Sequence, residues 1–166
     1  MKNSCMKCLV CSSAFAIFLI GFAFSAHAEF DGEAELQKIE LGKKIFFDSA
    51  LSKPVGQSCA SCHDPAFGFA NPDIGLPVSQ GAIRSRFGNR NAPSVAYAMF
   101  SPSLYYDPTM RPGIMEGMYV GGLFWDGRVN SLEEQAQAPF LNPLEMHNPD
   151  MKTVVLAVRR SDYAGL

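Results

Sequence analysis

Cys59-Ala60-Ser61-Cys62-His63 forms the pattern C-x-x-C-H, which is typical of covalent haem c attachment. In such a site each thiol adds to a haem vinyl group and the adjacent histidine ligates the iron. Two intervening residues let both thiols reach one edge of a porphyrin, while a helical turn brings the imidazole beneath the metal. The pattern therefore predicts a covalent haem c, held by Cys59, Cys62 and His63, with His63 as the iron ligand.

Other chemistries use paired cysteines, and the flanking sequence argues against them. A thioredoxin-like redox pair needs a strand before the motif and a helix after it. The approach, residues 51–58 (LSKPVGQS), does not read as a strand, and Pro65 and Pro72 interrupt the exit. A disulfide and a zinc site are the remaining alternatives, and a zinc site lacks enough ligands for a closed tetrahedral shell.

The N-terminal residues 1–28 have the pattern of a secretory signal peptide. Lys2 and Lys7 precede an apolar run, and Ala26-His27-Ala28 closes it with small residues. The apolar run is shorter than the roughly 20 residues that a membrane-spanning helix needs. We therefore expect export and cleavage after Ala28. Loss of the two lysines would lower the formal charge from −2 to −4.

The composition is that of a compact domain. The 166 residues are 48% hydrophobic and 18% charged, which excludes a disordered tail. The slightly acidic charge excludes a basic nucleic-acid binder, and we expect no nucleic-acid partner.

Helical patterns dominate the secondary structure that the sequence predicts. Apolar residues recur at helical spacing over residues 32–47, which predicts an amphipathic helix. A short helix is expected within 92–100. Ser131 begins a clearer helix, because it precedes an acid by three positions, and Pro139 should end it. Residues 148–150 (NPD) should cap a last helix.

Long irregular segments separate these helices. Residues 64–93 contain several prolines and glycines, and loops of that length are usually functional. The predicted fold class is mainly α, a cytochrome c-like haem domain with long loops. Because so much loop leaves a thin core, we expect the porphyrin to supply apolar surface. Candidates to line it are Phe67, Phe69, Phe100, Phe124 and Trp125.

Five segments in order carry a resemblance to a known family. They are residues 41–48 (LGKKIFFD), 88–94 (GNRNAPS), 124–128 (FWDGR), 131–136 (SLEEQA) and 142–146 (NPLEM). Together with the haem motif they resemble the bacterial di-haem cytochrome c peroxidase and MauG family over residues 36–160.

The resemblance implies a periplasmic enzyme that reduces hydrogen peroxide to water. Electrons would pass from a small c-type cytochrome or cupredoxin to a high-potential haem in a second domain, and from there to a peroxidatic haem in this first domain. Residues 29–166 would form that first domain, and the family also allows a homodimer. The chain holds no second C-x-x-C-H, so we expect a fragment that lacks the second haem domain.

Further site residues follow from the resemblance alone. Trp125 matches a tryptophan between the two haems, for which an electron-bridging role is proposed. Gln135 and Glu145 match the distal glutamine and glutamate beside the peroxide site. Asn91 matches an asparagine that helps to bind calcium between the domains.

The chemistry of peroxide cleavage suits a carboxylate without reference to the family. Heterolysis requires a proton to move from one oxygen to the other, and a carboxylate can act as base and acid in turn. A desolvated carboxylate against haem would have a raised pKa. The alternative interpretation of Glu145 is a solvated charge that caps a helix.

The distal ligand of the iron, and with it the reaction, is not determined by the sequence. Residues 64–95 contain no histidine that could block the iron, which suggests an open site or another blocking group. An open site would suit the MauG-like members, which oxidise a protein substrate. His147 could also be a distal ligand. A monohaem electron-transfer cytochrome would instead use His63 with an axial methionine, drawn from Met99, Met110, Met115, Met118 and Met146.

Overall fold

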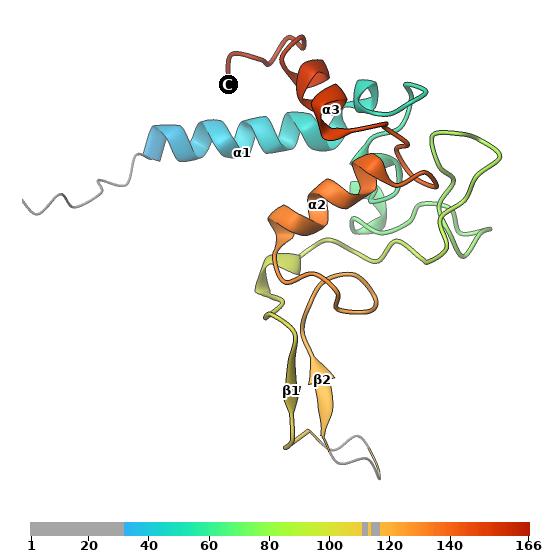
Figure 1. The fold of residues 1–166 in the computed structure, drawn as a ribbon, viewed down its shortest axis with the longest axis vertical. Coiled ribbons are helices and arrows are strands. Elements are labelled where there is room, and N and C mark those ends of the chain that lie inside the picture. Colours follow the sequence, from blue (N-terminus) through green and yellow to red (C-terminus); the bar gives the residue numbers. More distant parts are fainter. Residues whose placement is uncertain (1–31, 111–112, 114–116) are drawn as a thin grey trace, which may run out of the picture. The chain divides into compact units, whose positions relative to one another are not determined.

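Three α-helices and one two-stranded sheet form the regular structure of the residues that the computed structural model describes, which are 32–110, 113 and 117–166 (Figure 1). The predicted signal peptide, residues 1–28, lies outside them. The elements in chain order are α1 (Gly32–Phe47), β1 (Tyr105–Asp107), β2 (Met118–Val120), α2 (Leu132–Leu141) and α3 (Met151–Val158), with short 3₁₀ turns at Ser49–Leu51, Cys59–Ser61, Pro65–Phe67 and Ala98–Phe100. None of the described helices is long and apolar enough to cross a membrane.

Helix α1 has the predicted bounds, but its apolar side is largely uncovered. Leu36 and Ile39 are 67% and 60% exposed. Ile45, near the end of the helix, packs against the core, and the helix also contacts the turn Cys59–Ser61. The expected amphipathic packing is therefore confined to the C-terminal end of α1.

The core is small and joins three segments. Leu51, Phe140, Met146 and Val154 form one buried cluster. The amide of Asn148, 5% exposed, donates hydrogen bonds to the Leu51 carbonyl at 2.7 Å and the Phe140 carbonyl at 3.0 Å. These bonds satisfy buried backbone acceptors that no helix or strand would satisfy. They therefore join the segment before the haem motif to the end of α2.

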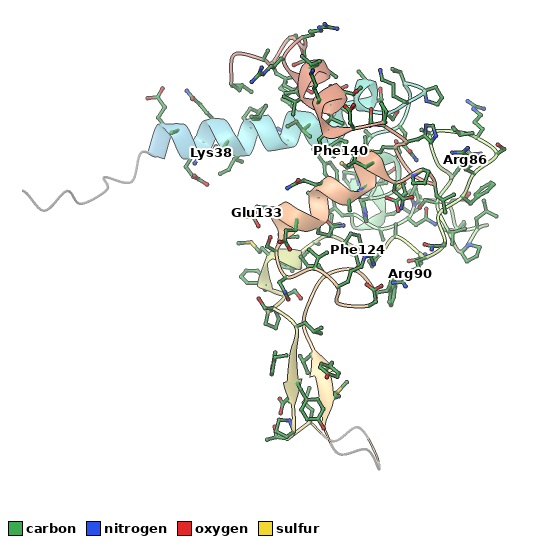
Figure 2. All side chains as sticks on the ribbon, viewed as in Figure 1. Lys38, Arg86, Arg90, Phe124, Glu133 and Phe140 are labelled. Carbon is green, nitrogen blue, oxygen red and sulfur yellow. The ribbon has the colours of Figure 1, made fainter. Side chains whose placement is uncertain are left out.

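Helix α2 begins as predicted and ends later than predicted. The Ser131 hydroxyl accepts from the Glu134 N–H at 3.3 Å, which caps the first turn. Pro139 lies inside the helix, which continues to Leu141, and Figure 2 labels Glu133 and Phe140 on it. Proline lacks an N–H, so the only helical hydrogen bond lost is the one to the carbonyl four residues earlier, that of Gln135.

The carbonyls of the last turn of α2 find donors in the segment that follows. The Pro139 carbonyl accepts from the Met146 N–H at 3.2 Å, and the Phe140 carbonyl accepts from the Asn148 N–H at 2.9 Å. These bonds compensate for the irregular helix end. Asp150 caps α3 as expected, because its carboxylate accepts from the Thr153 N–H at 2.7 Å.

The helix expected within 92–100 is reduced to one 3₁₀ turn at Ala98–Phe100. Tyr97 has a φ of +63°, in the left-handed region, which interrupts a right-handed helix. The hairpin of β1 and β2 was not predicted, since each strand has only three residues. Tyr106 and Tyr119 pair across it edge to face, with ring centroids 5.4 Å apart.

Asn148→Ala should destabilise the protein by about 1–3 kcal/mol, because it removes the side-chain donor of the Leu51 carbonyl, while the Phe140 carbonyl keeps the Asn148 backbone N–H. The measurement is the free energy of unfolding in denaturant. Lys152→Ala, at an exposed position of α3, is the control and should change it by less than ~0.5 kcal/mol. Equal effects of the two substitutions would contradict a structural role for the Asn148 amide.

Candidate functional site

One cavity is lined by all of the site residues that the sequence analysis predicted. Its volume is about 590 Å³, within the roughly 300–1,000 Å³ of ordinary ligand pockets. The haem motif, the 88–95 segment, the 122–128 segment, α2 and the turn after α2 all contribute to its wall. The predicted site residues that line it are Cys59, Cys62, His63, Asn91, Trp125, Gln135 and Glu145.

The haem motif forms a tight turn that holds two free thiols. The Ser61 hydroxyl accepts from the Ser58 N–H at 3.0 Å, and the His63 N–H bonds to the Cys59 carbonyl at 2.9 Å. Cys59 and Cys62 are not joined to each other. Burial, with a smaller contribution from Cys62, raises the pKa of Cys59 to about 11. A thioredoxin-like pair needs a lowered thiol pKa instead.

The His63 imidazole is oriented by two loop carbonyls. Its Nδ1 lies 3.2 Å from the Phe69 carbonyl oxygen and 3.0 Å from that of Pro93. Because both partners are acceptors, Nδ1 carries the proton and Nε2 keeps a free lone pair. Burial lowers the pKa of His63, which favours the neutral ring. A neutral ring with a free Nε2 is the form that ligates metal.

The donor set of this turn fits a covalently attached haem. Two unpaired thiols at the required spacing and one oriented imidazole face the same cavity. The methionines and the histidine that the sequence offers as a sixth iron ligand differ in their positions. Met146 lines the cavity but is 3% exposed and packs in the core. His147 does not line the cavity, and Met115 lies outside the described residues.

Glu145 lies in the turn after α2 and is half-buried. The Asn142 side-chain amide donates to Glu145 Oε1 at 2.8 Å. Burial raises the pKa of Glu145, and the Asn142 hydrogen bond and the charge of Arg128 oppose that rise. The half-buried position does not agree with a solvated helix cap. Gln135 reaches the same cavity from α2.

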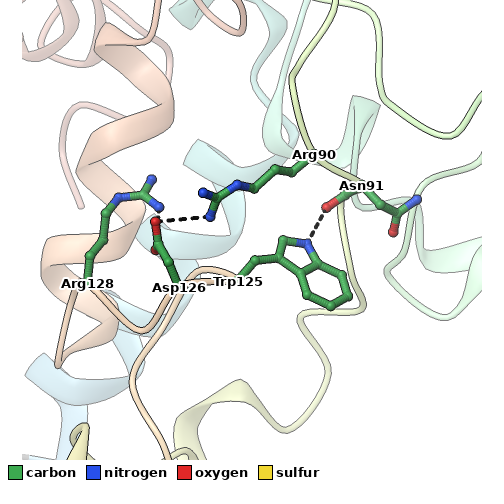
Figure 3. A network of polar contacts seen from close by, with 5 residues as sticks. All are labelled: Arg90, Asn91, Trp125, Asp126 and Arg128. Carbon is green, nitrogen blue, oxygen red and sulfur yellow. Dashed lines mark hydrogen bonds and ion pairs between the residues drawn. The ribbon is translucent and has the colours of Figure 1, made fainter. Parts of the chain in front are cut away.

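Trp125 is held by the loop that carries Asn91. Its indole Nε1–H donates to the Asn91 carbonyl at 2.8 Å (Figure 3), and the Asn91 side-chain amide donates to the Pro77 carbonyl at 3.1 Å. Trp125 is 64% exposed, so most of its side chain is accessible to solvent. Calcium binding by Asn91 stays a prediction.

A charge cluster joins the same two segments. The Asp126 carboxylate lies 3.0 Å from the Arg90 guanidinium and 2.7 Å from that of Arg128 (Figure 3). The Arg128 guanidinium also lies 3.6 Å from the centroid of the Phe124 ring. These exposed contacts tie residues 88–94 to residues 124–128 at the rim of the cavity.

Fewer of the predicted aromatic residues line the cavity than expected. Phe124 and Trp125 line the cavity, whereas Phe67, Phe69 and Phe100 do not. Phe67 and Phe100 are 49% and 72% exposed. The expectation is therefore wrong for these three, and Phe69 instead contacts Phe46, with ring centroids 6.1 Å apart.

Gln57 is a site residue that the sequence did not reveal. It is 5% exposed, and its Nε2 donates to the Gln80 carbonyl at 2.6 Å and lies 3.7 Å from Cys62 Sγ. Its Oε1 is buried without a hydrogen-bond partner in the described part of the chain. No sequence pattern marks a glutamine beside a haem motif as a site residue, so the contact could be found only in the structure.

Comparison with known proteins agrees with this geometry. A profile of the family described as di-haem cytochrome c peroxidase matches residues 36–166. The chain is 43% identical over 122 residues to the methylamine utilization protein MauG of Paracoccus denitrificans, covering 72% of this chain and 30% of that protein. It is 37% identical over 112 residues to the cytochrome c551 peroxidase of Pseudomonas aeruginosa, covering 68% and 26%.

A solved structure is also similar. The crystal structure of the diheme peroxidase BthA from Burkholderia thailandensis matches with a TM-score of 0.64 at 37% sequence identity, covering 76% of this chain and 30% of that chain. The chain therefore spans less than a third of the length of these relatives.

Exported together with a c-type haem maturation system, the chain should gain the mass of one haem and lose both free thiols. The double substitution Cys59→Ser, Cys62→Ser should gain none, because no thioether can form. Intact mass and thiol titration measure both results, and protein made without the maturation system is the control. A disulfide between Cys59 and Cys62 in protein from the complete system would contradict haem attachment.

Proposed function

The chain belongs to the di-haem cytochrome c peroxidase family, and we propose that it is the peroxidatic haem domain of a periplasmic enzyme that reduces hydrogen peroxide to water. The observation that carries the proposal is the shared cavity. Two free thiols, an imidazole with a free Nε2 and a half-buried carboxylate face the same space.

Haem, when bound, supplies the iron at which peroxide is reduced. Cys59 and Cys62 tether the macrocycle, and His63 presents Nε2 to the metal because loop carbonyls hold Nδ1. The Glu145 carboxylate accepts a proton from one peroxide oxygen and returns it to the other, which leaves as water. Gln135 orients the peroxide from α2.

Electrons reach the site from outside the cavity. Trp125 serves as the bridge, since its exposed ring borders both the cavity and the surface. The source is a second haem domain, reduced by a small c-type cytochrome or cupredoxin, with calcium held near Asn91. The exposed hydrogen-bonded indole supports this route.

Oxidation of a protein residue in the MauG manner is a second candidate function. Residues 64–95 hold no histidine to occupy the distal side, and the identity to a MauG protein is 43%. An electron-transfer cytochrome with methionine ligation is less favoured, because the one described methionine in the cavity wall packs in the core.

Glu145→Gln should slow the reaction of the ferric haem protein with peroxide by about 10²–10⁴-fold, because the amide cannot shuttle a proton. Stopped-flow absorption of the haem measures the rate. Glu133→Gln is the matched control, since Glu133 is an exposed acid on α2 away from the cavity. An unchanged rate in Glu145→Gln would refute the proton-transfer role.

The same rate should fall as the pH drops through the pKa of Glu145. Burial raises that pKa above its ordinary value of 4.5, and the carboxylate must be ionised to accept the proton. The rate of the parent protein is thus highest above this pKa, and the acid limb should disappear in Glu145→Gln. An acid limb that persists in the variant would assign it to another group.

The ferric protein should have a high-spin haem spectrum, because the proposed reaction requires a free distal position. Optical and electron paramagnetic resonance spectra at neutral pH measure the spin state. A low-spin spectrum that converts to high spin in Met146→Ala would instead favour the electron-transfer cytochrome.

A further inference from the structure

Residues 80–87 form a closed loop beside the turn that carries Glu145. Gln80 and Phe87 pair as an isolated antiparallel bridge. Within the loop, the Gly81 N–H bonds to the Arg86 carbonyl and the Arg86 N–H bonds to the Ile83 carbonyl, each at 2.8 Å. These internal bonds give the loop a defined shape although it contains no helix or strand.

One edge of the loop contacts the Glu145 turn at two polar points. The Ala82 N–H donates to the Glu145 carbonyl at 2.8 Å. The Arg86 guanidinium donates from Nη1 to the Pro143 carbonyl at 3.1 Å, across 57 positions of sequence. Both donors reach backbone acceptors on the turn, so the contacts fix the backbone of residues 143–145.

Gly81 brings the two segments into close approach. A Cβ atom on Gly81 would overlap the Leu144 carbonyl oxygen. The neighbour is backbone, which cannot rotate away as a flexible side chain can. Glycine at this position therefore permits the separation at which the hydrogen bonds of Ala82 and Arg86 form.

The other end of the loop contacts the haem motif. The Gln80 carbonyl accepts from Gln57 Nε2 at 2.6 Å, and that nitrogen lies 3.7 Å from Cys62 Sγ. The loop thus contacts both the segment that attaches the cofactor and the segment that carries the carboxylate. The Asn142 amide restrains the Glu145 side chain at 2.8 Å from within the turn.

We propose that the 80–87 loop sets the position of the Glu145 carboxylate relative to the haem, with Gly81 and Arg86 as its positioning residues. The inference rests on the proposed function for the role of Glu145. The proposed restraint on the backbone of residues 143–145 rests only on the contacts of the 80–87 loop. A shift of the backbone of residues 143–145 moves the carboxylate away from the bound ligand without removing any catalytic group.

A pair of substitutions on the same loop tests the proposal. Arg86→Ala removes the contact with Pro143, and Arg84→Ala removes an equal charge from an exposed side chain that does not line the cavity. Gly81→Ala adds the Cβ that Leu144 cannot accommodate. Each protein is exported, loaded with haem and compared with the parent, with Glu145→Gln and with Glu145→Leu.

Two measurements separate positioning from general damage. The first is the rate of the ferric protein with peroxide. The second is the charge-transfer band of the ferric fluoride complex, whose wavelength reports hydrogen bonds donated to the bound anion. Arg86→Ala and Gly81→Ala should lower the rate by about 10-fold or more, since a misplacement of about 1 Å can cost up to ~10²-fold.

The fluoride band of both variants should move toward that of Glu145→Leu, while Arg84→Ala keeps the parent rate and band. The proposal would be overturned if Arg86→Ala had the same peroxide rate and the same fluoride band as Arg84→Ala. This test does not depend on whether Gly81→Ala folds. Equal bands in the parent and Glu145→Leu would also overturn it. If Glu145→Gln leaves the peroxide rate unchanged but Arg86→Ala moves the band, the proposed reaction fails and the positioning role stands.

Discussion

Side-chain donors that reach the carbonyls of distant loops hold the walls of the cavity together. The described chain has three helices and two short strands, so most loop carbonyls lack a ladder partner and still need a hydrogen bond when buried. His63 supplies one to Pro93, Trp125 to Asn91, and Asn148 to Leu51. Each of these bonds joins segments that are at least 30 residues apart in the sequence.

Burial sets the charge state of the groups inside the cavity. It raises the pKa of Cys59 and Cys62, lowers that of His63 and raises that of Glu145. Every shift favours the neutral form, which suits the neighbourhood of an apolar macrocycle. The charges of Arg90, Asp126 and Arg128 lie at the exposed rim instead. The pKa of Glu145 is therefore raised by burial, and the Asn142 hydrogen bond and the charge of Arg128 oppose that rise.

The sequence predicted the elements that depend on interactions between residues close together in the chain. The helix at 32–47, the Ser131 and Asp150 caps and the haem motif depend on residues within a few positions of one another. The end of α2 could not be predicted from Pro139, because the helix continues to Leu141 and its last carbonyls accept from the following segment. Trp125, Gln135 and Glu145 were predicted as site residues from the family resemblance and not from their spacing in the sequence. Gln57, Gly81 and Arg86 carried no pattern, since their partners are 23 to 63 positions away or depend on a close backbone approach.

The position of Glu145 combines packing on one side with hydrogen bonding on the other. Its neighbour Met146 is 3% exposed and belongs to the core, which anchors the chain just after the carboxylate. Its own carbonyl and that of Pro143 accept from the 80–87 loop. The core packing of Met146 restrains the chain just after the carboxylate, and the loop contacts add restraint at the carbonyls of Pro143 and Glu145. A core this small can therefore support a well-placed acid, because polar contacts between loops supply the restraint that a larger apolar interior would otherwise provide.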